Sequence, residues 1–218
     1  MIRLLPLFAG IAPIAGVSIA YWLNVDAGLL PSCMPLLDGC TSISSTGRLL
    51  PGSMLFRAIL LPQSALLIVL WWISAAWLGR VAPDARSGKA IFTSGVIGAV
   101  ALVLYVTFLG TKQPFYEFMR HFGIYFYFLG TAVSQILLSL AMPRSGLRTA
   151  MLWVIATPFA LGVFNLLQKS LLSHPNNIEN RIEWTAALLM QVWFIQLYVA
   201  WRRTGLTLKV DVDSTSAR

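Results

Sequence analysis

Three residues with chemically useful side chains each stand just before a long uncharged apolar stretch: Arg57, His121 and Glu183. An arginine can bind phosphate through paired hydrogen bonds, a histidine exchanges protons near neutral pH, and a carboxylate can orient either of them. We therefore predict a site for an anionic group such as a lipid phosphate. In it, His121 and Glu183 are the candidate catalytic pair and Arg57 is a substrate-binding residue.

Other polar residues belong to the same predicted site. Ser44 and Thr46 lie in a segment rich in Ser and Thr, and Glu117 stands one helical turn before His121. We expect Ser44, Thr46 and Glu117 to complete the substrate-binding set. Ser and Thr beside Gly are also ordinary turn formers, and charged residues at the ends of membrane helices commonly reach to the interface. The alternative of separate interfacial groups without a shared site stays open.

The elements that must position these residues are six stretches without Asp, Glu, Lys, Arg or His, each long enough to cross a membrane as a helix. Of the 218 residues, 57% are hydrophobic and 11% charged, whereas a soluble domain has about 25% charged residues. Apolar residues occupy every face, unlike the alternating pattern of a membrane β-barrel. We predict an all-α fold, a polytopic membrane bundle of six transmembrane helices forming one domain over residues 1–218. The predicted spans are 4–23, 58–78, 90–110, 122–142, 149–168 and 184–201.

The distribution of Lys and Arg predicts the orientation of the bundle. With the N-terminus inside, ten of these residues fall in cytoplasmic segments and six in external ones, in the direction of the positive-inside rule. Both termini are then cytoplasmic. Residues 24–57 form a long external loop, and residues 204–218 form a disordered cytoplasmic tail. The second, fourth and sixth spans begin outside, which brings Arg57, His121 and Glu183 to the external face.

An alternative for the first span stays open. Met1 to Arg3, an apolar run and the triplet ending at Ala20 resemble a secretory signal with a cleavage site. Cleavage would leave five spans and an external N-terminus. The apolar run is longer than that of a usual signal, which favours a first span that stays in place.

Small residues in two of the predicted spans leave room for a close approach of helices, although they form no GxxxG pair. Gly95 and Gly98 lie in the third span, and Gly123 and Gly130 lie in the fourth. A glycine lets the backbone of a neighbouring helix approach closely inside a membrane.

Both cysteines of the chain, Cys33 and Cys40, lie in the external loop. Two cysteines at this spacing that face an oxidising compartment form a disulfide more often than a metal pair, so we predict a Cys33–Cys40 disulfide. A membrane zinc hydrolase would need three protein ligands, usually rich in His. The chain holds only His121 and His174. We therefore expect no metal and no other cofactor.

Several short motifs resemble the Frag/DRAM/Sfk family of six-span membrane proteins. Residues 40–47 read Cys-Thr-Ser-Ile-Ser-Ser-Thr-Gly and are followed by Pro51, with Phe56 and Arg57 opening the second span. Within the family, the order of features is most similar to the post-GPI-attachment lipid-remodelling factors.

The second half of the chain carries the same resemblance. Glu117 and His121 lead into an aromatic fourth span, and Glu183 and Trp184 lead into the sixth span ahead of a basic tail. The chain departs from the family in its two loop cysteines and in lacking a later His in the sixth span. The resemblance implies lipid remodelling or lipid-dependent regulation.

We therefore expect an integral membrane protein that binds or remodels a lipid with an anionic headgroup at the outer membrane–water interface. The alternative is a non-catalytic lipid-sensing or scaffolding protein that regulates a membrane-protein partner. Enzymatic turnover stays open, because the chain has no Gly-x-Ser-x-Gly elbow. The spans carry no acidic or basic residue at mid-membrane, unlike an ion-coupled transporter. The net charge of +8 suits the topology and anionic lipid, so we expect no nucleic-acid partner.

Overall fold

The computed structural model describes residues 2–171 and 176–207, with side chains described for residues 2–164 and 177–207. His174 and the predicted tail beyond residue 207 lie outside the described residues. Within the described part, six helices are long and apolar enough to cross a membrane, which confirms the all-α polytopic bundle. The long helices are α1 (Leu5–Asp26), α4 (Gly52–Val81), α5 (Gly88–Phe108), α6 (Pro114–Ala141), α7 (Gly146–Leu171) and α8 (Asn176–Arg203).

Most helices extend beyond the predicted spans because those spans exclude charged residues, whereas α5 ends at Phe108, before the predicted end at residue 110. α4 begins at Gly52 and α6 begins at Pro114, so Arg57 and His121 lie within helices rather than just before them. A helix continues past a charged residue where the chain leaves the hydrocarbon core, since a long side chain there can reach water. The boundaries of the helices therefore include the interfacial turns that the hydropathy pattern leaves out.

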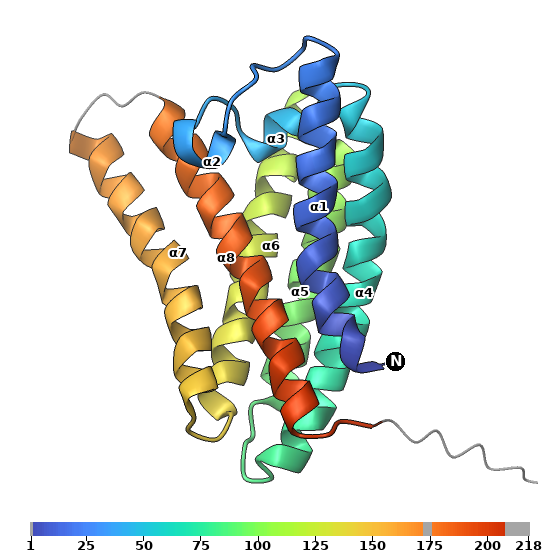
Figure 1. Ribbon diagram of the computed structural model, residues 1–218, viewed down its shortest axis with the longest axis vertical. Helices are drawn as coiled ribbons and strands as arrows, with labels where there is room; N and C mark the ends of the chain where they lie inside the picture. The colour runs from blue at the N-terminus through green and yellow to red at the C-terminus, as the bar shows by residue number, and fades with distance from the viewer. Residues whose placement is uncertain (1, 172–175, 208–218) are drawn as a thin grey trace, which may run out of the picture.

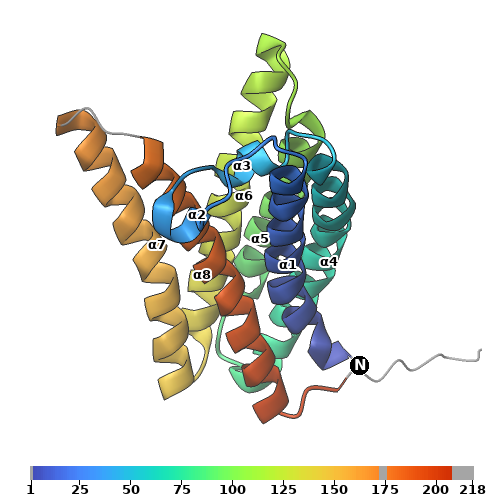
Figure 2. The same cartoon turned by 45° about the horizontal axis from the view of Figure 1, so that its top comes forward.

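The six long helices form an up-and-down ring (Figures 1 and 2). Along the chain, each long helix packs against the next, and α8 packs against α1 to close the ring. α7 stands farthest out and has the smallest buried share of the spans. Arg3 Nε donates to the Leu206 carbonyl oxygen at 2.6 Å. This bond places both described ends of the chain at the same end of the bundle; which side of the membrane that end faces stays a prediction.

α5 and α6 pack closely because glycines lie where their backbones meet. A Cβ atom added at Gly130 would lie 2.6 Å from the Ser94 carbonyl oxygen and 2.8 Å from the Gly98 nitrogen. A Cβ atom at Gly123 would meet the backbone nitrogen of Tyr105 at 2.5 Å. Gly98, Gly123 and Gly130 therefore permit the close contact of α5 and α6, whereas Gly95 packs against Trp71 of α4.

Large aromatic side chains fill the ring in the half nearer to the chain ends. Trp71 of α4 packs against Trp193 and Phe194 of α8, with ring centroids 5.9 Å and 5.7 Å away. All of these side chains are fully buried. Farther along the same two helices, Trp77 and Trp201 pack with centroids 6.4 Å apart. The opposite half of the ring holds the candidate site.

Candidate functional site

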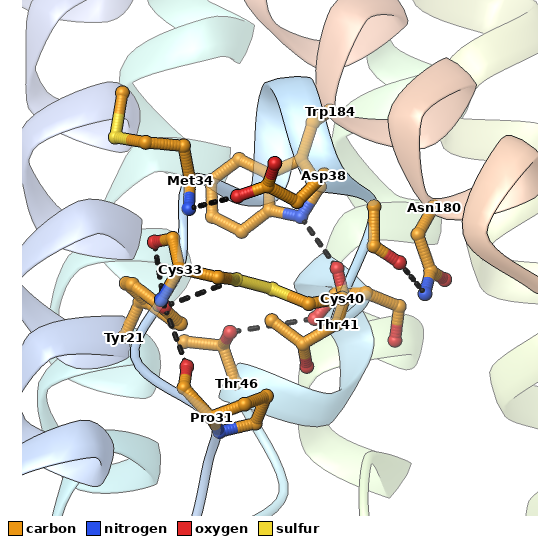
Figure 3. Close-up of a disulfide and its surroundings, with 12 residues drawn as sticks. Tyr21, Pro31, Cys33, Met34, Asp38, Cys40, Thr41, Thr46, Asn180 and Trp184 are labelled. Atoms are coloured by element: carbon orange, nitrogen blue, oxygen red, sulfur yellow. Dashed lines mark hydrogen bonds between the residues drawn. A yellow bond between two sulfur atoms is a disulfide. The ribbon is translucent and has the colours of Figure 1, made fainter.

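The connection between α1 and α4, residues 27–51, folds over one end of the bundle, and we call it the cap. It contains two short helices, α2 (Pro35–Asp38) and α3 (Ile43–Thr46). The disulfide between Cys33 and Cys40 joins the two sides of α2 and confirms the predicted pairing (Figure 3). The sequence predicts a long external loop here, and the structure packs this segment against the ends of the helices.

The cap is attached to α8 by side-chain hydrogen bonds (Figure 3). Asn180 Nδ2 donates to the Gly39 carbonyl oxygen at 2.8 Å, and Trp184 Nε1 donates to the Thr41 carbonyl oxygen at 2.9 Å. Gly39 has a φ of +64° and lies directly against the backbone of α8. A side chain at this position would be strained and would clash, so glycine is required for this contact.

Two residues of α1 fix the other side of the cap. The Tyr21 hydroxyl donates to the Pro31 carbonyl oxygen at 2.8 Å and accepts from the Cys33 nitrogen at 3.0 Å. Asn24 is fully buried. Its Nδ2 donates to the Thr46 carbonyl oxygen at 2.9 Å, and its Oδ1 accepts from the Gly52 nitrogen at 3.0 Å. Asn24 therefore ties α1, the cap and the start of α4 together.

Beneath the cap lies a cavity of about 300 Å³ between α1, α4, α5, α6 and α8. This volume is at the lower end of the range for ligand pockets, roughly 300 to 1,000 Å³. Its walls are largely apolar, and the cap residues from Cys33 to Leu36 form part of the lining. The apolar walls include Ile14, Val17, Phe56, Leu102, Phe128 and Leu188.

Polar groups without partners face this apolar cavity. The Tyr105 side chain is 3% exposed, and its hydroxyl has no hydrogen-bond partner among the described residues. Gln191 is 5% exposed, and its Oε1 is likewise without a partner within the described part of the chain. Its side chain pairs with the Tyr127 hydroxyl. Buried polar groups are nearly always hydrogen-bonded. A bound ligand could supply the hydrogen bonds that Tyr105 and Gln191 lack.

Glu183 is the acidic residue of the cavity wall. Its Oε1 accepts from the Ser44 nitrogen of the cap at 3.3 Å, a long hydrogen bond. The carboxylate interacts electrostatically with the Tyr105 hydroxyl and with Arg48. Within the described part of the chain, no Lys, Arg or His side chain lines this cavity. Glu183 is thus a partly buried charge with weak compensation, an arrangement that typically costs free energy unless something pairs with it.

Two arginines lie close to Glu183 or Tyr105 but do not line the cavity itself. Both Arg48 and Arg120 lie within electrostatic range of Tyr105, and neither makes a hydrogen bond to its hydroxyl. Arg48 Nη2 donates to Ser44 Oγ at 2.7 Å, and the Arg120 side chain is only 11% exposed. Glu183, Tyr105 and these two arginines form what we call the polar end of the cavity.

Of the six predicted site residues, two cap residues take different roles. Ser44 contacts Glu183 through its backbone nitrogen and Arg48 through its hydroxyl, so it belongs to the polar end. Thr46 is fully buried, and its Oγ1 donates to the Ser42 carbonyl oxygen at 3.3 Å. The contacts of Thr46 are therefore made within the cap and with Asn24.

The structure places Arg57 and His121, both of them described residues, outside the lining of this cavity. Arg57 is exposed and its Nη2 donates to the Leu109 carbonyl oxygen at the end of α5, at 2.7 Å. His121 is exposed and lies 3.4 Å from Arg120 Nη2, and Glu117 forms a 3.0 Å salt bridge with the same nitrogen. His121 and Glu117 thus approach the polar end through Arg120. The predicted roles of Arg57, His121 and Glu117 in binding or catalysis stay predictions.

Sequence reasoning missed Tyr105, Gln191, Arg48 and Arg120. A glutamine inside an apolar span was an available signal, because polar residues within a membrane usually have a specific partner or function. Tyr105 gave no comparable signal among the other aromatic residues of the spans. Nothing in the sequence pattern distinguished Arg48 and Arg120 from the other arginines near the external face.

Within the residues that the structure describes, no three His, Cys, Asp or Glu side chains gather in a way that could hold a metal ion. Comparison of the chain with protein-family models, with curated proteins and with solved structures gives no match. The geometry of the cavity and its polar end therefore supplies the functional argument.

Proposed function

We propose that this integral membrane protein binds or remodels a lipid with an anionic headgroup at the outer membrane–water interface. The cavity carries the proposal, because it combines apolar walls, the unpartnered polar groups of Tyr105 and Gln191, and a polar end that holds Glu183. An acyl chain suits the apolar walls, and a headgroup suits the polar end. A cavity of this composition is the usual form of a small-molecule site.

The anionic part of the headgroup is assigned to the arginines of the polar end. Arg48 belongs to the cap and Arg120 belongs to α6. Both lie within electrostatic range of Tyr105. An arginine binds a phosphate group with paired hydrogen bonds and stays charged at all physiological pH values. We place a lipid phosphate at the mouth of the cavity, between these two side chains.

The proposed orientation puts the cap outside and both termini in the cytoplasm. The cap lies at the end of the bundle opposite to the chain ends, and it carries the Cys33–Cys40 disulfide. Disulfides persist in oxidising, extracytoplasmic compartments. The disulfide and the Lys and Arg distribution therefore support the same orientation.

We also propose membership of the Frag/DRAM/Sfk family, on the strength of its short motifs. Residues 40–47 form part of the cap, and Glu183 and Trp184 both line the cavity. Part of the motif residues thus lies around the cavity, whereas Arg57, Glu117 and His121 lie outside its lining. If His121 and Glu183 are a catalytic pair, as the sequence predicts, His121 must act from its place beside Arg120.

Filling the cavity should abolish lipid binding. Ile14 of α1 lines the cavity, so Ile14→Trp places a large side chain where the acyl chain would lie. We expect native mass spectrometry of the protein released from membranes to show bound lipid on the wild type, with occupancy reduced at least about tenfold in Ile14→Trp. A tenfold loss corresponds to about 1.4 kcal/mol of binding free energy.

A matched control is available on the same helix. Ile19 is 51% exposed on the outside of the bundle, so Ile19→Trp adds the same side chain without filling the cavity. This variant should keep the wild-type lipid occupancy. Equal occupancy in Ile14→Trp and the wild type, or no bound lipid on any of the three proteins, would contradict the proposed function.

A non-catalytic lipid sensor or scaffold is the second candidate function. The weak packing of α7 favours it, because α7 has the smallest buried share of the six candidate spans and presents large apolar side chains such as Trp153 and Phe159 outwards. A membrane-protein partner could pack against this face. The same mass spectra separate the candidates: an enzyme alters the mass of an added lipid over time, whereas a sensor returns it unchanged.

A further inference from the structure

We infer that the cavity selects a lipid whose headgroup carries an ammonium group, and that Glu183 binds this group. The inference rests on the proposed function and names the class of lipid. It starts from a mismatch in the polar end: a lipid phosphate would satisfy the two arginines, but it would leave the carboxylate of Glu183 without a short-range partner of opposite charge.

The hydrogen-bonding groups that face the cavity are mainly acceptors. Glu183 offers two carboxylate oxygens, of which Oε1 receives one long bond from Ser44. The unpartnered Tyr105 hydroxyl can accept as well as donate. Gln191, about two helical turns farther along α8, offers an unpartnered Oε1 deeper in the cavity. An ammonium group carries donors and no acceptor, so it complements Glu183 and Tyr105.

The charge of the wall favours a cation at the same place. Glu183 is the charged residue that lines the described cavity, and within the described residues its carboxylate has no basic side chain within salt-bridge distance. Arg48 acts on it only at longer range. A ligand ammonium would supply the missing short-range partner, and the low polarity of the walls would strengthen the attraction.

Aromatic rings line the same cavity as the Glu183 carboxylate and suit the same group. Tyr21, Trp184 and Tyr105 all line the cavity, and Trp184 is the neighbour of Glu183 in α8. The faces of Tyr and Trp rings attract cations, including the substituted ammonium groups of lipid headgroups. The carboxylate and these rings are therefore open to the same cavity, and both favour a cation there.

A zwitterionic phospholipid satisfies both halves of the polar end. Its phosphate faces Arg48 and Arg120, and its ammonium group faces Glu183. Its acyl chain continues along Leu102 and Leu188 into the apolar part of the cavity. This arrangement pairs every charged group of the polar end with a group of opposite sign on one ligand.

The test measures which headgroup the protein binds in competition. Phosphatidylethanolamine and phosphatidylglycerol with identical acyl chains are offered together to the purified full-length protein in detergent, and native mass spectrometry reports which lipid is bound. We expect the wild type to prefer phosphatidylethanolamine at least about tenfold. Glu183→Gln removes the charge but keeps an acceptor for the Ser44 nitrogen, and this preference should disappear.

Three controls separate the possible causes. Glu183→Asp keeps the negative charge and should retain part of the preference. Asp26→Asn removes an exposed carboxylate at the same end of the bundle and should leave the preference unchanged. Free phosphoethanolamine, which has both charged groups but no acyl chain, should compete at least about a hundredfold more weakly than the lipid if the apolar walls contribute.

Two results would overturn the inference: a wild type that binds both lipids equally or prefers phosphatidylglycerol, and a Glu183→Gln variant that keeps the wild-type preference. Either outcome leaves the proposed function standing, provided that Ile14→Trp still loses lipid of both kinds. Free phosphoethanolamine competing as strongly as the lipid would show that the site recognises a soluble amine and would refute the lipid as its ligand.

Discussion

Gly130→Leu should prevent the bundle from reaching its native packing. A Cβ atom at Gly130 lies 2.6 Å from the Ser94 carbonyl oxygen and 2.8 Å from the Gly98 nitrogen, both of which are backbone atoms of α5. Backbone atoms cannot move aside as the end of a flexible side chain does, so α5 and α6 must separate. Forced overpacking commonly costs about 1 to 3 kcal/mol, and we expect the upper end of this range or more.

Separation of α5 and α6 would also break the hydrogen bond between the Ser94 and Ser134 hydroxyls, which are 2.6 Å apart. The measurement is the midpoint of thermal unfolding in detergent, followed by tryptophan fluorescence. Gly162→Leu is the matched control, because a Cβ atom at Gly162 in α7 meets no atom within 4 Å. Similar midpoints for the two variants would show that the glycines do not set the distance between α5 and α6.

Asn24→Ala should loosen the cap from the bundle. In the wild type, the Asn24 side chain is hydrogen-bonded to the Gly52 nitrogen and the Thr46 carbonyl oxygen. The substitution leaves both of these buried groups without a partner. An unsatisfied buried polar group costs about 1 to 3 kcal/mol, so we expect the variant to lose about 2 to 4 kcal/mol of stability. The expected sign is faster hydrogen exchange across cap residues 27–51, together with a lower unfolding midpoint.

Asn180→Ala is the comparison for this prediction. Asn180 makes one hydrogen bond to the cap, to the Gly39 carbonyl oxygen, at a partly exposed position. Water can replace part of that bond, so the loss should be about 1 kcal/mol. An Asn24→Ala variant as stable as Asn180→Ala would refute the role of Asn24 as the anchor of the cap.

The six-helix bundle could be predicted from the sequence because a membrane span has a simple physical requirement. The absence of charge over a length sufficient to cross the hydrocarbon core identified every long helix. The ends of the helices were harder to predict. α6 begins at Pro114, before Glu117 and His121, because helix formation is not limited to the hydrocarbon core. The packing order around the ring depends on contacts such as Gly130 against Ser94, which no span shows by itself.

The site was less predictable, because it depends on where side chains point around each helix. Glu183, Ser44 and the Cys33–Cys40 disulfide gather at the cap end as the loop assignment suggested. Arg57 stands at the same end, but its side chain turns towards Leu109 of α5. The position of a residue near the start of a span fixes its depth in the membrane. It does not determine the direction in which the side chain points around the helix.

The cap shows why contacts between residues far apart in the sequence could not be predicted. Its fold depends on Asn180 and Trp184, which lie far away in sequence and donate to cap carbonyl groups. No local pattern in residues 27–51 predicts that Asn180 and Trp184 bind this segment. The cavity exists because the cap covers the end of the ring that the aromatic cluster around Trp71 leaves unfilled.

The most direct test of the central claim is photo-crosslinking with a phospholipid that carries a diazirine in its acyl chain, added at about one lipid per protein in detergent. After illumination and digestion, mass spectrometry locates the labelled residues. The proposed acyl-chain site predicts label around Ile14 of α1 and Leu188 of α8, which both line the cavity, and loss of that label in Ile14→Trp. Label confined to outward-facing residues such as Ile11 and Ile19, which are 47% and 51% exposed, would contradict it.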